Sequence, residues 1–252
     1  MSSTTGAADA GSALVRLGNF FFRWRDALSP VVLLSLLVVT RPWIPARGVA
    51  WDISLDVVGL LVAFTGQALR VAVVGYAYIV RGGKDREVYA EDLVTRGFFA
   101  TSRNPLYVGN LLIYCGLMMV WNSPWMYLLA VPFYLLMYRS IVAAEEEFLL
   151  RKFGDAYRRY CQRVNRWMPD LRRLPEGLVG MAFNWRRVLL KEYGTIAAWT
   201  LTGGLLLVLE RTASPPYQRR AGEIPWIVGG MVGIVLLWGV TRWLKLSRRL
   251  RA

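Results

Sequence analysis

Residues 105–142 read PLYVGNLLIYCGLMMVWNSPWMYLLAVPFYLLMYRSIV, two apolar runs joined at 122–123 by a short polar turn. Each run approaches the roughly 20 residues that a helix needs to cross the hydrocarbon core of a bilayer. Pro105 stands at the start of the first run, where the missing N–H of proline does no harm to a helix. This stretch predicts a hairpin of two membrane-spanning helices.

Four further apolar runs flank this hairpin, at 28–40, 53–80, 195–210 and 224–241. The runs at 28–40 and 195–210 are short for a spanning helix, so we expect each to be tilted, extended by interfacial aromatic residues or only partly inserted. The chain is 55% hydrophobic with a mean hydropathy of +0.35, yet its net charge is +14. We predict an all-α fold, a polytopic transmembrane helix bundle of about six spans with cytoplasmic amphipathic helices.

The basic residues assign a side of the membrane to each loop. Of the 31 Lys and Arg residues, 25 fall on the side that holds the N-terminus, segments 81–104 and 139–193, and the C-terminus, whereas five fall on the other side. Because cytoplasmic loops carry the excess of Lys and Arg, both termini and both long loops are predicted to be cytoplasmic. We expect an integral protein of the bacterial inner membrane, whose basic loops face anionic membrane lipids and not nucleic acid.

The composition excludes several kinds of chemistry. The chain has no His, which removes His-based acid/base catalysis, Ser-His-Asp and Cys-His nucleophile systems and His-ligated metals. Its two cysteines, Cys115 and Cys161, cannot build a Cys-rich metal site. We therefore predict an enzyme or binding protein without a metal.

Two features lie within the predicted spans. Arg70 is the only charge deep in a span, and three interpretations stay open: a snorkelling side chain, a partner for a carboxylate on a neighbouring helix, or a contact to an anionic ligand on the cytoplasmic side. Gly229 and Gly233 form a G-x-x-x-G in the last span, a pattern typical of close helix packing.

A polar, aromatic stretch at 93–110 adjoins the start of the central hairpin. It places Arg103 and Asn104 directly before the helix that begins at Pro105. Unpaired backbone N–H groups at a helix N-terminus and an arginine fork both favour a carboxylate or phosphate group.

A second stretch, 144–169, follows the hairpin. It begins with three consecutive glutamates, Glu145 to Glu147, which need cationic partners or a cationic ligand beside an anionic leaflet. An amphipathic helix is predicted to follow, which on the simplest interpretation lies on the membrane. Its apolar face consists of Leu149, Phe153, Tyr157, Tyr160 and Val164.

Together these stretches resemble the membrane-embedded methyltransferases that include isoprenylcysteine carboxyl methyltransferase and phosphatidylethanolamine N-methyltransferase. That family carries R-H-P-x-Y-x-G at the start of one span and, after a two-span hairpin, E-E-x-x-L, F-G-x-x-Y-x-x-Y and an Arg-containing run that ends in Pro. The elements here are RNPLYVG at 103–109, EEEFL at 145–149, FGDAYRRY at 153–160 and RVNRWMP at 163–169. The family's His is replaced by Asn104, whose amide can form hydrogen bonds but cannot be protonated.

The resemblance implies S-adenosyl-L-methionine as methyl donor, with its carboxylate near Arg103 and its ammonium near Glu145 or Glu146. Adjacent glutamates point about 100° apart on a helix, so we expect one of them to face the cofactor and the other to pair with Arg. The resemblance also implies that Arg163 aims the acceptor. The residues expected to bind the cofactor are Arg103, Asn104, Pro105, Leu106, Tyr107, Gly109, Glu145, Tyr157 and Tyr160, and those expected to act in catalysis are Arg163 and Glu146.

We therefore expect an integral membrane methyltransferase that depends on S-adenosyl-L-methionine and acts on a lipid-like or amphipathic acceptor. Without His, an amine acceptor would need Glu, Tyr or water to take its proton, so carboxylate O-methylation is slightly preferred over amine N-methylation. Three alternatives stay open: an NADPH-dependent membrane reductase of the sterol type, which would need the basic loop at 81–103 for its phosphates, a small transporter, and a non-enzymatic scaffold.

The expected organisation has four parts. They are a disordered or interfacial N-terminus at 1–27, a methyltransferase-like membrane core at 28–169 with its cofactor region at 93–169, an interfacial cytoplasmic segment at 170–194, and an additional transmembrane pair with a basic tail at 195–252.

Overall fold

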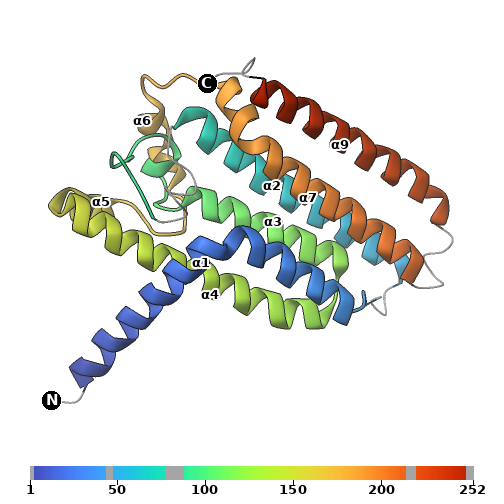
Figure 1. The fold of residues 1–252 in the computed structure, drawn as a ribbon, viewed down its shortest axis with the longest axis horizontal. Helices are drawn as coiled ribbons and strands as arrows, with labels where there is room; N and C mark the ends of the chain where they lie inside the picture. Colours follow the sequence, from blue (N-terminus) through green and yellow to red (C-terminus); the bar gives the residue numbers. More distant parts are fainter. Residues whose placement is uncertain (1–2, 44–47, 78–87, 214–219, 248–252) are drawn as a thin grey trace.

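The computed structural model describes residues 3–43, 48–77, 88–213 and 220–247. In these residues the chain is helical and has no strand, which confirms the predicted all-α bundle (Figure 1). The α-helices are α1 Ser3–Val39, α2 Val49–Tyr76, α3 Pro105–Trp121, α4 Pro124–Phe153, α5 Asp155–Arg163, α6 Leu174–Leu178, α7 Trp185–Ala213 and α9 Ile224–Leu246. The 3-10 helices are η1 Gly97–Ala100, η2 Leu171–Arg173 and η3 Ala221–Glu223.

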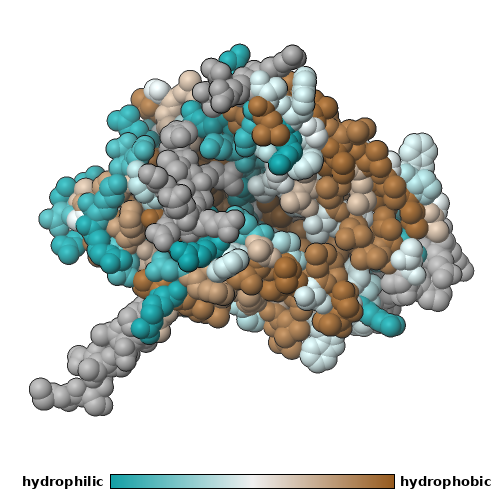
Figure 2. Space-filling view, in the orientation of Figure 1, coloured by the Kyte–Doolittle hydropathy of each residue, from teal (hydrophilic) through white to brown (hydrophobic). Residues whose placement is uncertain are grey.

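Among the described residues, four helices are long and apolar enough to cross a membrane: α2, α4, α7 and α9. Helix α3 is equally apolar but only 17 residues long. The remaining predicted run, 28–40, lies almost wholly in the C-terminal part of α1, which packs against α4. Apolar side chains cover much of the surface over the long helices, whereas hydrophilic ones gather at the end near α5 (Figure 2). This distribution is that of a membrane-embedded bundle with one polar end.

Two helices are longer than the apolar runs predicted. Residues 1–27 were expected to be disordered or interfacial; α1 is helical from Ser3 onward, a stretch that is rich in Ala and has no Pro before Pro30, and the interfacial position of this part stays a prediction. The short run expected at 195–210 belongs to the longer α7, which begins at Trp185 within the segment expected to be interfacial. The added turns include Glu192, a charged residue that hydropathy alone had excluded from the span.

Glycines set the close contact between α2 and α3. A Cβ added at Gly59 would lie 2.6 Å from the carbonyl oxygen of Gly116, and one added at Gly66 would lie 2.5 Å from that of Gly109. In both helices the two glycines are seven residues apart, about two turns, so one face of each helix meets the other. The backbones of α2 and α3 therefore touch without side chains between them.

The predicted packing role of Gly229 and Gly233 in α9 is wrong within this chain. A Cβ added at either glycine would have no heavy atom within 4 Å among the neighbours that the structure describes. Helix α9 instead packs on α7, where a Cβ added at Gly204 would lie 2.8 Å from Cγ of Met231.

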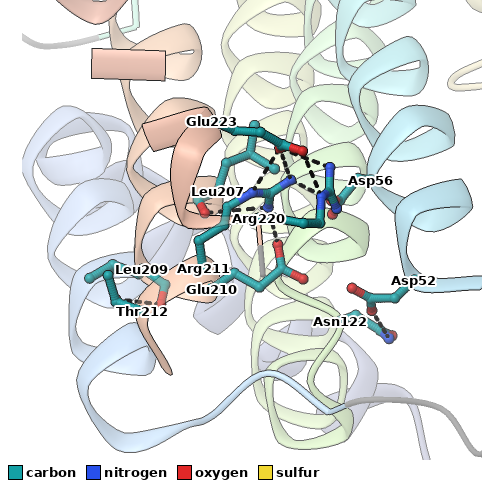
Figure 3. Close-up of polar contacts among 10 residues, drawn as sticks. All are labelled: Asp52, Asp56, Asn122, Leu207, Leu209, Glu210, Arg211, Thr212, Arg220 and Glu223. Atoms are coloured by element: carbon teal, nitrogen blue, oxygen red, sulfur yellow. Dashed lines mark hydrogen bonds and ion pairs between the residues drawn. The ribbon is translucent and has the colours of Figure 1, made fainter. Parts of the chain in front are cut away.

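A buried ion-pair cluster fastens α7 to α2 at one end of the bundle (Figure 3). Arg211 of α7 contacts Glu210 at 2.7 Å, Asp56 of α2 at 3.4 Å and Glu223 of η3 at 3.4 Å. Glu210, Asp56 and Asp52 are all buried, and their carboxylate oxygens lie within 4.8 Å of one another. Arg211 therefore supplies a positive charge inside a largely acidic group, and its side chain is only 3% exposed.

Candidate active site

A cavity of about 870 Å³ lies at the other end of the bundle. Helices α1, α3, α4, α5, α7 and α9 all contribute to its wall, together with the segment 88–94. Its volume is in the range of small-molecule and cofactor sites. Eight of the eleven residues that the sequence singled out line it: Arg103, Asn104, Leu106, Tyr107, Glu145, Glu146, Tyr157 and Tyr160.

Glu146 is held between two arginines on one wall of the cavity. Arg103 Nη1 lies 3.1 Å from Glu146 Oε1, and Arg166 binds both carboxylate oxygens, at 3.0 Å and 2.5 Å. Arg103 also donates to Cys161 Sγ at 2.7 Å. Burial disfavours the charge on Arg103, but the Glu146 carboxylate and the Cys161 thiol outweigh it and raise the pKa of that guanidinium. The Nε of Arg103 is buried and has no hydrogen-bond partner among the described residues.

Asn104 connects the start of α3 to the chain that follows α5. Its Nδ2 donates to the carbonyl oxygen of Arg166 at 3.0 Å, and the neighbouring Arg103 N–H donates to the carbonyl oxygen of Asn165 at 2.8 Å. An amide forms this contact as well as a neutral imidazole would. Asn104 therefore helps to position Arg166 beside Glu146.

Glu145 faces a different set of partners. Tyr107 Oη donates to Glu145 Oε1 at 2.6 Å, and Arg25 Nη1 of α1 donates to Tyr107 Oη at 2.9 Å. Both Glu145 and Glu146 line the cavity, but only Glu146 pairs directly with Arg, as expected for one member of the pair. The Arg25–Tyr107–Glu145 chain joins α1, α3 and α4 around the cavity.

The apolar face predicted for α5 packs against the protein. Tyr157, Tyr160 and Val164 form a buried cluster with Leu149 and Phe153, so this face does not lie on the membrane as the simplest interpretation had it. Tyr160 Oη donates to the carbonyl oxygen of Phe99 at 2.7 Å, and burial raises the pKa of both tyrosines above the ordinary value. Both phenols are therefore neutral at physiological pH, and both rings are available as cavity walls.

Three of the predicted site residues lie away from the cavity wall. Arg163 is exposed at the end of α5. Pro105 is the buried first residue of α3 and therefore has a role in starting the helix. A Cβ added at Gly109 would lie 2.6 Å from Cγ of Arg70, so this glycine allows α3 to pack closely against α2. Arg163 was expected to aim the acceptor, whereas Arg166, three residues later in the same run, is the arginine that binds Glu146.

Arg70 has the buried carboxylate partner that one interpretation required. Its Nε and Nη2 bind Glu192 of α7 at 2.9 Å and 3.1 Å, and it also contacts the side-chain oxygen of Asn110. Gln67 donates to Glu192 at 3.1 Å, and Asn110 donates to Tyr138 Oη at 2.8 Å. Arg70 also lines the cavity, so this network forms part of its wall.

Sequence reasoning missed several of these residues. Arg25 entered only the count of basic residues, and Glu192 lay outside the predicted fifth span. The polar Asn110 within an apolar run was the one signal that could have indicated a buried polar network.

The part of the chain that holds most of these residues is similar to known proteins. A family model described as phospholipid methyltransferase matches residues 56–156, which include most of α2, all of α3 and α4 and the first residues of α5. The chain belongs to the phospholipid methyltransferase family. It is also 36% identical over 63 residues to an uncharacterized protein of Haemophilus influenzae, a match that covers 25% of this chain and 79% of that protein. No solved structure matches the chain.

The family match supports a membrane methyltransferase, and four of the described helices are long and apolar enough to cross a bilayer. The matched residues include the Arg103–Glu146 contact and the Tyr107–Glu145 contact. Helices α1, α7 and α9, which also line the cavity, lie outside the matched residues.

Proposed function

We propose that this protein transfers a methyl group from S-adenosyl-L-methionine to a lipid-like or amphipathic acceptor. The observation that carries the proposal is the cavity itself. It brings Arg103, Glu145 and Glu146 together with Tyr157 and Tyr160, although these residues come from the loop before α3 and from the helices α4 and α5. A single pocket with an arginine, two carboxylates and aromatic rings matches the charges of this cofactor.

The residues present fit the cofactor. Arg103 has a buried Nε without a partner among the described residues, which suits a carboxylate of a ligand. Glu145 has no arginine directly against it and suits the ammonium group, whereas Glu146 holds Arg103 and Arg166 in place. The rings of Tyr157 and Tyr160 suit the adenine or the positive sulfur. When bound, S-adenosyl-L-methionine supplies a methyl group on a positively charged sulfur.

The cavity residues allow carboxylate O-methylation without a general base, because an ionised carboxylate is already a nucleophile. An amine acceptor must lose a proton, and Glu145 with Tyr107 would be the group to receive it. We therefore keep the carboxylate as the slightly preferred acceptor. Because Arg163 is exposed and does not line the cavity, we propose that a cation of the cavity wall aims the acceptor in its place.

We further propose that the cavity end faces the cytoplasm of a bacterial cell, in the inner membrane. The 25-to-5 distribution of basic residues supports this orientation. The segments 81–87 and 248–252, which carry some of these basic residues, lie outside the described residues. The first of them is also part of the loop at 81–103 on which the NADPH alternative depends.

Calorimetric binding of S-adenosylhomocysteine to the detergent-purified protein tests the cofactor proposal, with NADPH measured in parallel. Arg103→Ala is expected to weaken binding about 10- to 100-fold, since a charge-assisted hydrogen bond contributes about 1.5–3 kcal/mol. Arg158→Ala is the matched control, because Arg158 forms an exposed ion pair with Asp155 on α5. Binding of NADPH in place of S-adenosylhomocysteine would move the protein to the reductases, and binding of neither would favour a scaffold or transporter.

A further inference from the structure

The cavity extends beyond the residues that the proposed cofactor would contact. On α7 its wall runs from Leu190 to Thr202, and on α3 it runs from Asn104 to Leu117. At 1.5 Å per residue each of these walls is about 18–20 Å long. That length exceeds half the thickness of a bilayer's hydrocarbon core, about 30 Å, so the cavity reaches well into the membrane.

The deep part of the cavity is mostly apolar. We call it the apolar arm. Its wall consists of Leu33 of α1, Ile113 and Leu117 of α3, and Ala198, Trp199 and Thr202 of α7. Its members come from three helices, and α1 and α7 lie outside the family match. A long hydrocarbon chain is the ligand that such a surface binds by burial.

The mouth of the cavity on the α7–α9 side is basic. Lys191 of α7 and Lys245 of α9 both line the cavity, and Lys245 Nζ lies 5.2 Å from the centre of the Tyr193 ring. No carboxylate ion-pairs with Lys245 within the part of the chain that the structure describes. The acidic residue of α7 in this region, Glu192, is turned toward Arg70 and does not line the cavity.

The carboxylates that do line the cavity come from other walls. Among the described residues they are Asp26 of α1, Glu91 and Asp92 of the connecting segment, and Glu145 and Glu146 of α4. In the described part of the chain, the charged side chains that α7 and α9 contribute to the cavity wall are thus both lysines, and they lie on the same wall as the apolar arm's α7 residues. An anionic group with a hydrocarbon chain complements both features.

We propose that α7 and α9 form the acceptor subsite: Lys191 and Lys245 bind the anionic group of a lipid, and its hydrocarbon chain lies in the apolar arm. This proposal rests on the proposed methyltransferase function and names the class of acceptor. The anion is either the carboxylate of a fatty acid, which is then the nucleophile, or the phosphate of a phospholipid, whose amine is then the nucleophile.

Both reactions balance. With a carboxylate, an O–CH₃ bond forms as the S–CH₃ bond of the sulfonium breaks, a neutral thioether leaves, and no proton moves. With a phospholipid amine, an N–CH₃ bond forms in its place, and the nitrogen releases one proton.

The experiment measures methyl transfer by the full chain in phosphatidylcholine vesicles with three acceptors: palmitate, phosphatidylethanolamine and hexadecylamine. Hexadecylamine has the same chain length as palmitate but no anionic group. We expect palmitate or phosphatidylethanolamine to have a kcat/KM at least tenfold above that of hexadecylamine, and the preferred one identifies the anion. The double variant Lys191→Gln, Lys245→Gln is expected to raise the KM of the preferred acceptor about tenfold while the affinity for S-adenosylhomocysteine stays within twofold.

The control is Arg242→Gln, which removes an exposed positive charge of α9 that contacts Trp238 and does not line the cavity. An equal rise in KM in this control would overturn the proposal, since it would show a general effect of surface charge. An unchanged KM in the double variant would overturn it as well, as would a preference for hexadecylamine. If the protein binds S-adenosylhomocysteine but methylates neither palmitate nor phosphatidylethanolamine, the proposal is also overturned. If it does not bind S-adenosylhomocysteine, the proposed methyltransferase function is overturned instead.

A second variant tests the apolar arm. Thr202→Trp adds a large side chain to its wall and is expected to lower turnover of palmitate at least tenfold, with turnover of octanoate within threefold of the unmodified protein. For a phospholipid acceptor, the same comparison uses long-chain and dihexanoyl phosphatidylethanolamine. An equal effect on long and short chains, with S-adenosylhomocysteine binding intact, would show that no hydrocarbon chain lies there.

Discussion

Glu145 and Glu146 are adjacent in sequence and have separate partners in the structure. Glu146 pairs with Arg103 and Arg166, whereas Glu145 accepts from Tyr107. The difference follows from the helix: a rotation of about 100° per residue turns the two side chains toward different neighbours. The two neighbouring carboxylates thereby differ in their partners: two arginines bind Glu146, and a tyrosine hydroxyl donates to Glu145.

Tyr107→Phe tests the Arg25–Tyr107–Glu145 chain. The change removes the hydroxyl that donates to Glu145 and accepts from Arg25, and leaves a buried carboxylate without this donor. We expect the free energy of unfolding in detergent to fall by about 1–3 kcal/mol. Tyr127→Phe is the control, because its hydroxyl makes only a 3.5 Å contact to Asn122, and an equal loss there would contradict the assignment.

Arg166→Ala and Arg163→Ala form a matched pair. Arg166 binds both oxygens of Glu146, whereas Arg163 is exposed and outside the cavity wall. We expect Arg166→Ala to weaken S-adenosylhomocysteine binding about tenfold, in line with the roughly 1.4 kcal/mol that a partly exposed bidentate contact can supply. Arg163→Ala is expected to leave binding and turnover within twofold. A loss of turnover in Arg163→Ala with S-adenosylhomocysteine binding intact would restore the acceptor-aiming role first expected for Arg163, and equal losses of binding in both variants would contradict the assignment of Arg166.

At the scale of helices, the α2–α3 contact depends on glycines that occupy the same face of each helix. In a membrane the apolar surface of a helix gains little from meeting another apolar helix, so close backbone packing is a main source of association. The contact places Gly109, in the first half of α3, directly against Arg70 of α2.

Gly66→Val tests this packing. The new side chain would meet the carbonyl oxygen of Gly109, so α2 and α3 would have to separate, at a cost of about 1–3 kcal/mol in the free energy of unfolding. Thermal unfolding in detergent measures the change. Gly233→Val in α9 is the control, because open space surrounds that position, and a comparable loss there would show that α9 also packs through its glycines.

At the scale of the whole molecule, two buried ion pairs hold α7 against α2. Arg70 binds Glu192 near the cavity, and Arg211 binds Asp56 near the opposite end (Figure 3). Arg70 and Asp56 are 14 residues apart on α2, about 21 Å along the helix. The α7–α9 pair is thereby held at two widely separated points, which fixes one wall of the cavity.

Arg211→Met tests the cluster distant from the cavity. Removal of this cation leaves Asp56 and Glu210 without their main buried partner, and breaking such a pair costs about 3–5 kcal/mol of unfolding free energy. Arg211→Met combined with Asp56→Asn and Glu210→Gln is expected to recover part of that loss, since the uncompensated charges are gone. A single change that costs less than about 0.5 kcal/mol, the scale of an exposed pair such as Arg158–Asp155, would contradict this account.

The sequence by itself determined the helical class and the central hairpin, and it singled out eight of the residues that line the cavity. Apolar runs, proline positions and the distribution of basic residues are properties of short segments. Comparing the length of each run with the thickness of the bilayer is enough to predict the helices. The motif residues at 103–109 and 145–160 lie at helix ends, so their neighbourhood around one end of the hairpin followed from connectivity alone.

Only the tertiary structure decided which residues meet. Glu146 pairs with Arg166 and not Arg163, Arg70 pairs with Glu192 across 122 residues of sequence, and Arg25 of α1 reaches Tyr107. Each of these contacts depends on how a helix is rotated and where it crosses another, and a shift of one residue turns a side chain by about 100°. The hydropathy of the sequence does not predict that rotation, because in a membrane bundle the lipid-facing and the buried sides of a helix are both apolar.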